Sequence, residues 1–212
     1  MRGKVIAVIG DIVASRKIKA RERFDEKLRN VLDAVNVQKT GLLSPYTLTI
    51  GDEIQAVFGN AGALFDDAMA ILSAIYPERM RFAFGVGDLS TPINPERAIG
   101  MDGPAFYSAR AGIEVLKKSG YLFTLEGEGI PAMALIQKNL SLISFLMDKW
   151  NDTRMHTLAS LQQGIPVKEI AASLRVSDKA VYKTIEAGNL ELIMELFGEI
   201  ETLINASLEE VR

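Results

Sequence analysis

The stretch "LTIGDEIQAVF", residues 48–58, holds two runs of alternating apolar residues on either side of a Gly-Asp-Glu tip. Apolar residues at every second position are typical of strands that bury one face, and Gly-Asp is typical of a tight turn. The stretch therefore predicts a β-hairpin. Its tip also presents two adjacent carboxylates, Asp52 and Glu53, so it is a candidate cation site as well as a candidate plain turn.

The segments around the hairpin extend this pattern into a mixed α and β fold. Before it, the nearly continuous apolar run "KVIAVIGDIV" predicts a strand buried on both faces, and an amphipathic helix follows. After it come a second helix, in "AGALFDDAMAILSAIY", and a strand, in "MRFAFGVGD". The order is that of the ferredoxin-like βαββαβ unit, so the fold class is α+β. The predicted buried faces are Phe24, Leu28, Val31, Leu32 and Val35 on the first helix and Leu64, Ala68, Ile71, Leu72 and Ile75 on the second.

The second half of the chain divides into two parts. A long irregular segment, "LSTPINPERAIGMDG", precedes a helix in "PAFYSARAGIEVLKKSG", a strand in "YLFTLEG" and a connecting helix in "AMALIQKNLSLISFLMDKW". From about Asn151 the pattern indicates helices only. We therefore expect a palm-like α+β domain over residues 1–149 and an all-α domain over residues 150–212.

The composition narrows the chemistry. The chain has no cysteine and one histidine, which excludes disulfides, thiolate metal sites and multi-histidine metal sites. Any metal would be held by carboxylates, which favours Mg²⁺ or Mn²⁺. The net charge of −3 gives no general affinity for polyanions. The first apolar run meets Asp11 too early for a signal peptide or a membrane span, so we expect a cytoplasmic protein.

The predicted topology gathers acids at one place. In a ferredoxin-like sheet the first and third strands are antiparallel neighbours, which brings Asp11, near the end of the first strand, close to Asp52 and Glu53, at the start of the third. Converging carboxylates repel unless a cation or protons intervene, and Mg²⁺ is commonly held by one or two carboxylates with substrate phosphates. The alternative is structural: Asp11 ends a strand or caps a helix, and Gly-Asp makes a turn.

Four motifs carry a family resemblance. "GDIVASR", "TIGDEIQAVFG", "RFAFGVGD" and "GMDGPAFYSARAG" resemble the SatD family of bacterial proteins, over nearly the whole chain. More broadly, the chain also resembles the palm-type nucleotidyl cyclases and the GGDEF-type diguanylate cyclases. Their first strand ends in Asp-Ile, as Asp11-Ile12 does here, and their hairpin tip carries a Gly-Asp pair, like Gly51-Asp52. In the GGDEF type a Glu follows, like Glu53.

The resemblance implies a ligand set. Asp11 and Asp52 would hold two Mg²⁺ (or Mn²⁺) ions, with Glu53 as a further candidate ligand, and the nucleotide would be a purine triphosphate. The backbone near Ile12 and Gly51 would approach its phosphates. Arg16 is a separate candidate, which either reaches a phosphate or lies in solvent. Because palm cyclases usually work as dimers, the resemblance also implies a homodimer.

The catalytic part of the resemblance is less complete. Arg110, in "FYSAR", is similar to the cyclase arginine that stabilises the transferring phosphate. Phe106 stands where class III cyclases have an Asn four residues before that arginine, and Ser15-Arg16 replaces their Phe-Thr pair. Two interpretations stay open here: an active, metal-dependent nucleotidyl cyclase or phosphoryl-transfer enzyme, and a domain that binds a nucleotide without turning it over.

The stretch "MHTLASLQQGIPVKEIAASLRVSDKAVYKTIEAG" predicts a helix-turn-helix. Ser177 is a good N-cap for its second helix, whose exposed start would place Lys179, Tyr182 and Lys183 against DNA. From Arg154 to Thr184 five Lys/Arg face two acids, a local charge of +3 that suits phosphates. The predicted small core is Ile170, Ala171, Leu174, Val176, Val181 and Ile185.

Two features count against DNA binding. Arg175 stands where such turns usually have Gly, and a left-handed backbone there costs about 1 kcal/mol. The final helix is acidic, and its stripe is predicted to pack or dimerise; the stripe is Leu192, Leu196, Ile200 and Leu203. A protein partner is therefore the alternative to DNA.

The sequence leads to a regulatory protein as the first hypothesis: a Mg²⁺-dependent nucleotide site in the palm, coupled through the segment 88–103 to a tail that binds DNA or a partner. The first alternative is the active cyclase-like enzyme. The second is a DNA-binding protein whose degenerate palm serves only for dimerisation.

Overall fold

The computed structural model describes residues 3–38, 41–49 and 52–209. Five strands form one mixed sheet in the order β2-β3-β1-β4-β5. β1 is antiparallel to β3 and β4, β2 is antiparallel to β3, and β5 is parallel to β4. The strands are β1 (Val5–Ile12), β2 (Leu42–Leu48), β3 (Glu53–Phe58), β4 (Met80–Gly87) and β5 (Phe123–Gly127). The predicted α+β class and the pairing of the first strand with the third are confirmed.

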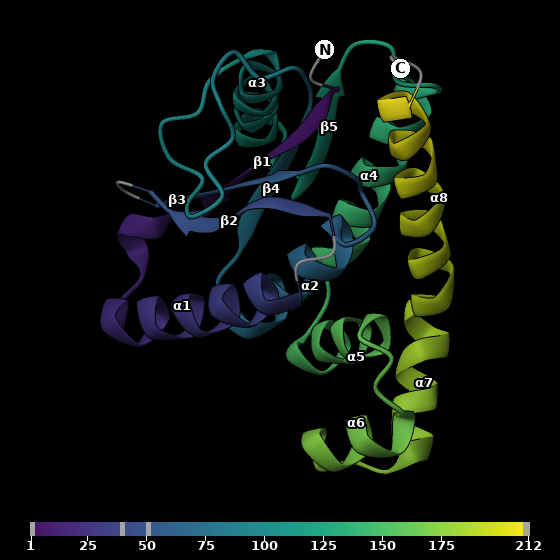
Figure 1. The fold of residues 1–212 in the computed structure, drawn as a ribbon. Helices are drawn as coiled ribbons and strands as arrows, with labels where there is room; N and C mark the ends of the chain where they lie inside the picture. Colours follow the sequence, from purple (N-terminus) through teal and green to yellow (C-terminus); the bar gives the residue numbers. More distant parts are fainter. Residues whose placement is uncertain (1–2, 39–40, 50–51, 210–212) are drawn as a thin grey trace.

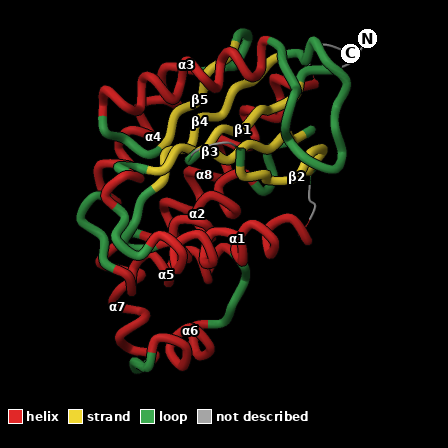
Figure 2. The backbone as a smooth tube through the Cα atoms, turned by 90° about the vertical axis from the view of Figure 1, so that its left-hand side faces the viewer, coloured by secondary structure: helices red, strands yellow, loops and turns green. Residues whose placement is uncertain are grey.

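Helices cover both faces of the sheet (Figures 1 and 2). α1 (Arg21–Gln38) and α2 (Leu64–Ile75) cover one face, and α3 (Pro104–Ser119) covers the other. A short 3₁₀ turn, η1 (Ser15–Lys17), links β1 to α1, and α4 (Met133–Met147) follows β5. Both predicted helix faces are buried, with Val31 only partly so.

The α3 helix lies very close to the sheet because glycines stand at the contact. A Cβ at Gly85 on β4 would overlap the backbone of Ala105 and Ala109 on α3. A Cβ at Gly112 on α3 would come within 2.8 Å of the Thr124 side chain and 2.9 Å of Ala83. This close approach sets the side chains of α3 over the ends of β1 and β4, where the candidate site lies.

The segment 88–103 is tied to the sheet edge. The Ser44 hydroxyl on β2 donates to the Asn94 carbonyl at 2.6 Å, and the Ala98 N–H donates to the Thr47 hydroxyl at 2.9 Å. Asp102, at the end of the segment, accepts a hydrogen bond from the hydroxyl of Tyr107 on α3 at 2.8 Å. The segment therefore packs on β2 and the start of α3 and contributes no acid to the cluster at Asp11.

The C-terminal part is helical, as predicted, and shares the main core. Its helices are α5 (Asp152–Gln162), α6 (Val167–Leu174), α7 (Asp178–Gly188) and α8 (Leu190–Glu209). Trp150 is buried in the same apolar cluster as α2 and α8, and α8 runs back beside α4 (Figure 1). One continuous core therefore crosses the predicted boundary at residue 149.

Two details of the tail differ from expectation. Val176 was expected in the small core but lies in the turn between α6 and α7 and is 39% exposed. Of the predicted stripe on α8, Ile200 is buried and Leu196 and Leu203 are partly buried against the core, but Leu192 is 54% exposed. The most buried line of α8 includes Leu190, Ile193, Phe197, Ile200 and Ile204, and Phe197 packs on Phe65 of α2 and Phe123 of β5.

No helix in the described part of the chain is both long enough and apolar enough to span a bilayer.

Candidate functional site

The predicted acids lie at one end of the sheet. Asp11, the last residue but one of β1, lies opposite Glu53 on β3, and the Ile12 N–H donates to the Asp52 carbonyl at 3.1 Å. This register follows from the antiparallel pairing of β1 with β3, in which the end of one strand meets the start of the other. The backbone therefore places all three acidic residues within two neighbouring strand ends.

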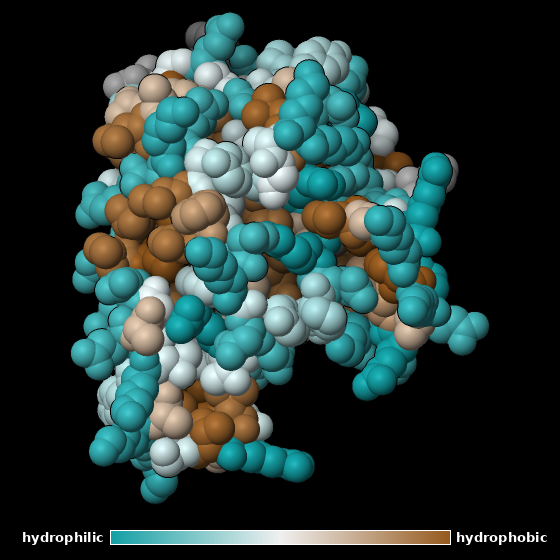
Figure 3. Space-filling model, turned by 180° about the vertical axis from the view of Figure 1, so that it is seen from behind, coloured by the Kyte–Doolittle hydropathy of each residue, from teal (hydrophilic) through white to brown (hydrophobic). Residues whose placement is uncertain are grey.

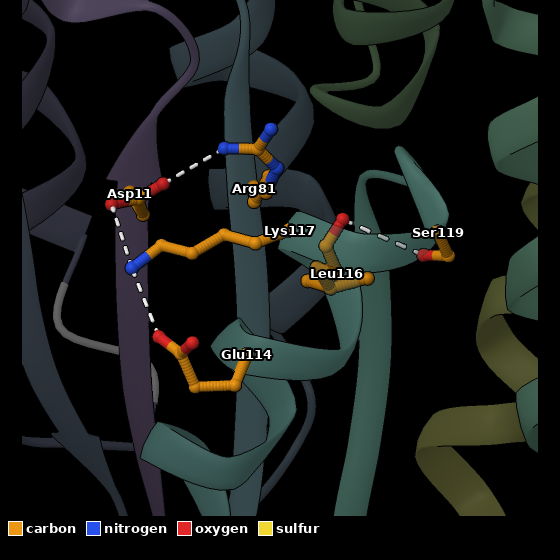
Figure 4. A network of polar contacts seen from close by, with 6 residues as sticks. All are labelled: Asp11, Arg81, Glu114, Leu116, Lys117 and Ser119. Atoms are coloured by element: carbon orange, nitrogen blue, oxygen red, sulfur yellow. Dashed lines mark hydrogen bonds and ion pairs between the residues drawn. The ribbon is translucent and has the colours of Figure 1, made fainter.

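Asp11 is held on the α3 side of the sheet (Figure 4). Its Oδ2 accepts from Arg81 on β4 at 2.9 Å, and its Oδ1 lies 3.9 Å from Lys117 Nζ on α3. Lys117 also pairs with Glu114, at 3.0 Å. The Asp11 and Arg81 side chains are only 20% and 15% exposed, so this pair is less screened than a surface pair.

Asp52 is held on the opposite side, by the segment that leads into α1. Its Oδ1 lies 2.8 Å from the Arg21 guanidinium, which also pairs with Asp25 at 2.8 Å. A hydrogen bond from the Ser15 side chain, assisted by Arg21 and Arg16, lowers the pKa of the Asp52 carboxyl below its ordinary value of 3.8. The pKa of Arg21 is raised in turn by its hydrogen bond to Asp52. Asp52 is therefore held ionised.

The side chains of Asp11 and Asp52 thus turn towards different cations. Glu53 lies on the same face of the sheet as Asp11, its direct antiparallel partner, and its Oε1 accepts from the Gln55 amide at 2.6 Å. Within the described residues no three acidic or histidine side chains converge in a way that could hold a metal ion. The donor set, carboxylates only, is of the type that Mg²⁺ and Mn²⁺ take. Both aspartates would have to exchange an ion pair for the metal.

The other predicted palm residues are spread around this end of the sheet. Ile12 is buried at the end of β1, and Arg16 is exposed in η1. Arg110 is exposed on α3, two turns before Lys117, and the side chain that reaches Asp11 from that helix is Lys117. Phe106 is fully buried under α3. Gly51 lies outside the described residues.

The basic side chains that pair with Asp11 and Asp52 were not among the predicted site residues. Arg81 had a local signal, since it is the one charged residue in the strand "MRFAFGVG" and stands opposite Asp11 in the antiparallel register. No local sequence signal pointed to Arg21, Lys117 or Ser15. These residues reach the site from helix and turn positions that only the packing of the fold determines. Together with Arg16 the site holds four basic side chains around two aspartates.

The predicted tail residues lie on an exposed helix. Ser177 caps α7 by accepting from the Ala180 N–H, and Lys179, Tyr182 and Lys183 are all exposed on α7, with Tyr182 at 61%. Arg175 adopts a left-handed backbone at the C-cap of α6, with φ 55° and ψ 43°. Beyond Tyr182, Glu186, Glu191 and Glu195 make the end of α7 and the start of α8 acidic.

A second group of acids lies between α2 and α8. Asp67 on α2 is 3% exposed and lies beside the buried Tyr46 hydroxyl, and Glu201 on α8 accepts from the Phe65 N–H at 3.3 Å. Burial raises the pKa of both Asp67 and Glu201 to about 7. Burial also raises the pKa of Asp66, on the same turn of α2. Among the described residues none of these three acids forms a salt bridge.

Comparison with known proteins places the chain in a family. The sequence profile described as the SatD family matches residues 5–196. The chain belongs to the SatD family. Among curated proteins, no sequence matches this SatD-family chain.

Two solved structures are weakly similar to this SatD-family chain, and both are titled as a bacterial light-regulated adenylyl cyclase. The first is 16% identical, with a TM-score of 0.39, over 58% of this chain and 75% of the other. The second is 15% identical, with a TM-score of 0.36, over 58% of this chain and 42% of the other.

Proposed function

We propose that this SatD-family protein is a regulator whose palm-like domain binds a nucleotide together with a divalent cation at the joined ends of β1 and β3. The observation that carries the proposal is the mixed charge of that end of the sheet. Asp11 and Asp52 are there with Arg16, Arg21, Arg81 and Lys117. Carboxylates suit a hard cation, and guanidinium and ammonium groups suit phosphate oxygens.

In this proposal the ion pairs keep the charges balanced until ligand binds. Arg81 has a donor to spare, since its buried Nε has no hydrogen-bond partner in the described structure. When a phosphate group accepts from Arg81 and Lys117, the Asp11 carboxylate is released. When another accepts from Arg21, Asp52 is released. The exchange replaces each internal ion pair with a ligand contact, so no charge is left buried and unpaired.

Asp11 and Asp52 would then hold the Mg²⁺ or Mn²⁺ ion, which when bound neutralises phosphate charge. Arg16, exposed in η1, would contact the phosphates from the α1 side, and Lys117 from the α3 side. Arg110 lies on the exposed face of α3 and is available to a ligand or to a second copy of the chain. We favour binding over turnover because Phe106 is fully buried where cyclases have their Asn.

The test is calorimetric titration of ATP and GTP with Mg²⁺. Binding should need Mg²⁺ and should weaken at least tenfold in Asp52→Asn and Asp11→Asn. Asp33→Asn removes an exposed carboxylate from the far side of α1 and is the matched control. Binding that persists without Mg²⁺ and ignores both site variants would contradict the proposal. Release of a cyclic or linear product in the same samples would favour the enzyme over the regulator.

We propose further that α6 and α7 act as a helix-turn-helix that binds DNA through Lys179, Tyr182 and Lys183. The left-handed Arg175 and the Ser177 cap support this, because they fix the angle between two short helices and leave the start of α7 exposed. The expected signature is salt-sensitive binding to duplex DNA that Lys179→Gln and Lys183→Gln each weaken. Lys138→Gln, on α4, is the control. If both tail variants leave DNA binding unchanged, the DNA interface is not at the start of α7.

A further inference from the structure

A groove of about 510 Å³ separates the palm from the tail. α1 and α2 form one wall, and α5 with α6 forms the other. Figure 3 shows the molecule hollowed between these two parts when it is seen from behind. Small-molecule sites favour such places, where two parts of a fold meet, and usually have volumes of about 300–1,000 Å³. The groove lies on the side of the sheet that α1 and α2 cover, whereas Asp11 and Lys117 lie on the α3 side.

The polar groups in this groove have a definite arrangement. The Ser173 hydroxyl donates to the Ile170 carbonyl at 2.8 Å, so its oxygen accepts from His156 Nε2, 3.1 Å away. We assign the hydrogen to Nε2 on this basis, which leaves Nδ1 of a neutral imidazole as an acceptor. His156 is half-buried and its ring lines the groove. The chain thus offers its one imidazole as a fixed acceptor.

The charged groups that line the groove favour a cationic ligand over an anionic one. Glu169 on α6 lines it, and no lysine or arginine is among the described residues that do. A phosphate-bearing ligand would therefore find a carboxylate and no cation. Ser73, Ser160 and Gln163 add neutral polar groups, and Val31, Ala70 and Ile165 add apolar surface. These groups suit a ligand with one positive nitrogen and an apolar body.

We infer that this groove is a binding site for a small organic cation, with its ammonium group between Glu169 and His156 Nδ1 and its apolar part against α1 and α2. Such a ligand touches the palm and the tail together, so it stabilises their present arrangement in proportion to its occupancy. The site does not depend on the nucleotide site, whose acids and cations it does not share.

The single histidine makes the test direct. The full chain, without a histidine tag, is titrated with benzylammonium while the His156 ring signals are followed by NMR. Benzyl alcohol and benzoate are the neutral and anionic probes of the same shape. We expect saturable shifts with benzylammonium, at a dissociation constant on the order of a millimolar for so small a ligand, and at least tenfold weaker binding of both other probes.

The variants decide whether the groove is responsible. Glu169→Gln, at an exposed position, should weaken benzylammonium binding at least tenfold, and Glu186→Gln, an exposed glutamate outside the groove, should leave it unchanged. Ser173→Ala should weaken binding because it frees the His156 ring to turn. Equal binding of the three probes, binding that Glu169→Gln does not alter, or no saturable shift at His156 would each overturn the inference.

Discussion

The two groups of acids in this protein have opposite surroundings. At the ends of β1 and β3, Asp11 and Asp52 each lie within 2.9 Å of a guanidinium, and the pKa of Asp52 is lowered. Between α2 and α8, Asp67 is buried and Glu201 is half-buried, neither has a basic partner among the described residues, and desolvation raises the pKa of each to about 7. The same residue type is thus kept charged in one place and close to neutral in the other.

The difference shows what each region is suited to do. Charged acids with exchangeable basic partners at a sheet end can take up a cation and a phosphate. Acids buried between two helices cost stability when they ionise, so they tie the attachment of α8 to pH rather than to a ligand. The first group is a candidate site, and the second is part of the contact that holds the tail on the palm.

The largest expected effect on stability comes from removing a buried side chain from the contact between α2 and α8. Phe197 on α8 stacks on Phe65 of α2 with ring centroids 4.3 Å apart, and it is 2% exposed. Phe197→Ala should lower the free energy of unfolding by about 3–5 kcal/mol, measured in urea. Hydration of the contact should also lower the pKa of Asp67 and Glu201. Val37→Ala, at an exposed position, is the control.

A smaller effect is expected from neutralising the buried acids. Folding raises their pKa from 3.8 for Asp67 and 4.5 for Glu201 to about 7. The native state therefore holds protons that the unfolded state releases, and stability should fall as pH rises through this window. Asp67→Asn and Glu201→Gln keep an acceptor oxygen and should flatten that fall, so Tm at pH 8 should exceed that of the wild type by roughly several degrees. An unchanged pH profile in both variants would show that these acids are ionised in the native state at neutral pH.

The smallest effect on stability is expected at the candidate site. Arg21→Gln removes the guanidinium from Asp52, and because both side chains are about a third exposed it should cost less than about 1 kcal/mol. The pH dependence has the opposite sign to that of the buried acids. The lowered pKa of Asp52 makes its contribution present above pH 3.8 and lost as pH falls through the folded value. NMR titration of the Asp52 carboxyl should show its pKa rising in Arg21→Gln and unmoved in Arg29→Gln, a substitution elsewhere on α1.

Much of the fold was predictable because its signals are local. Alternating and helical periodicities identified the strands and helices, the hairpin at residues 48–58 paired β2 with β3, and the βαββαβ order placed β1 beside β3. The same register put Asp11 beside Glu53 and the backbone of Asp52. Arg81 was also within reach of this reasoning, since its position follows from the pairing of β1 with β4. Val176 was placed wrongly because apolar type alone does not say which way a turn residue points.

The sequence alone determined the order of elements, the strand ends that carry the acids and the capped turn between α6 and α7, since each depends on neighbours a few residues apart. Only the tertiary structure decided which side chains those acids meet. Lys117 reaches Asp11 because glycines let α3 lie close on the sheet, and Glu201 reaches the N–H of Phe65 because α8 folds back on α2. Charge and burial at these places are set by residues more than a hundred positions apart, which no local pattern records.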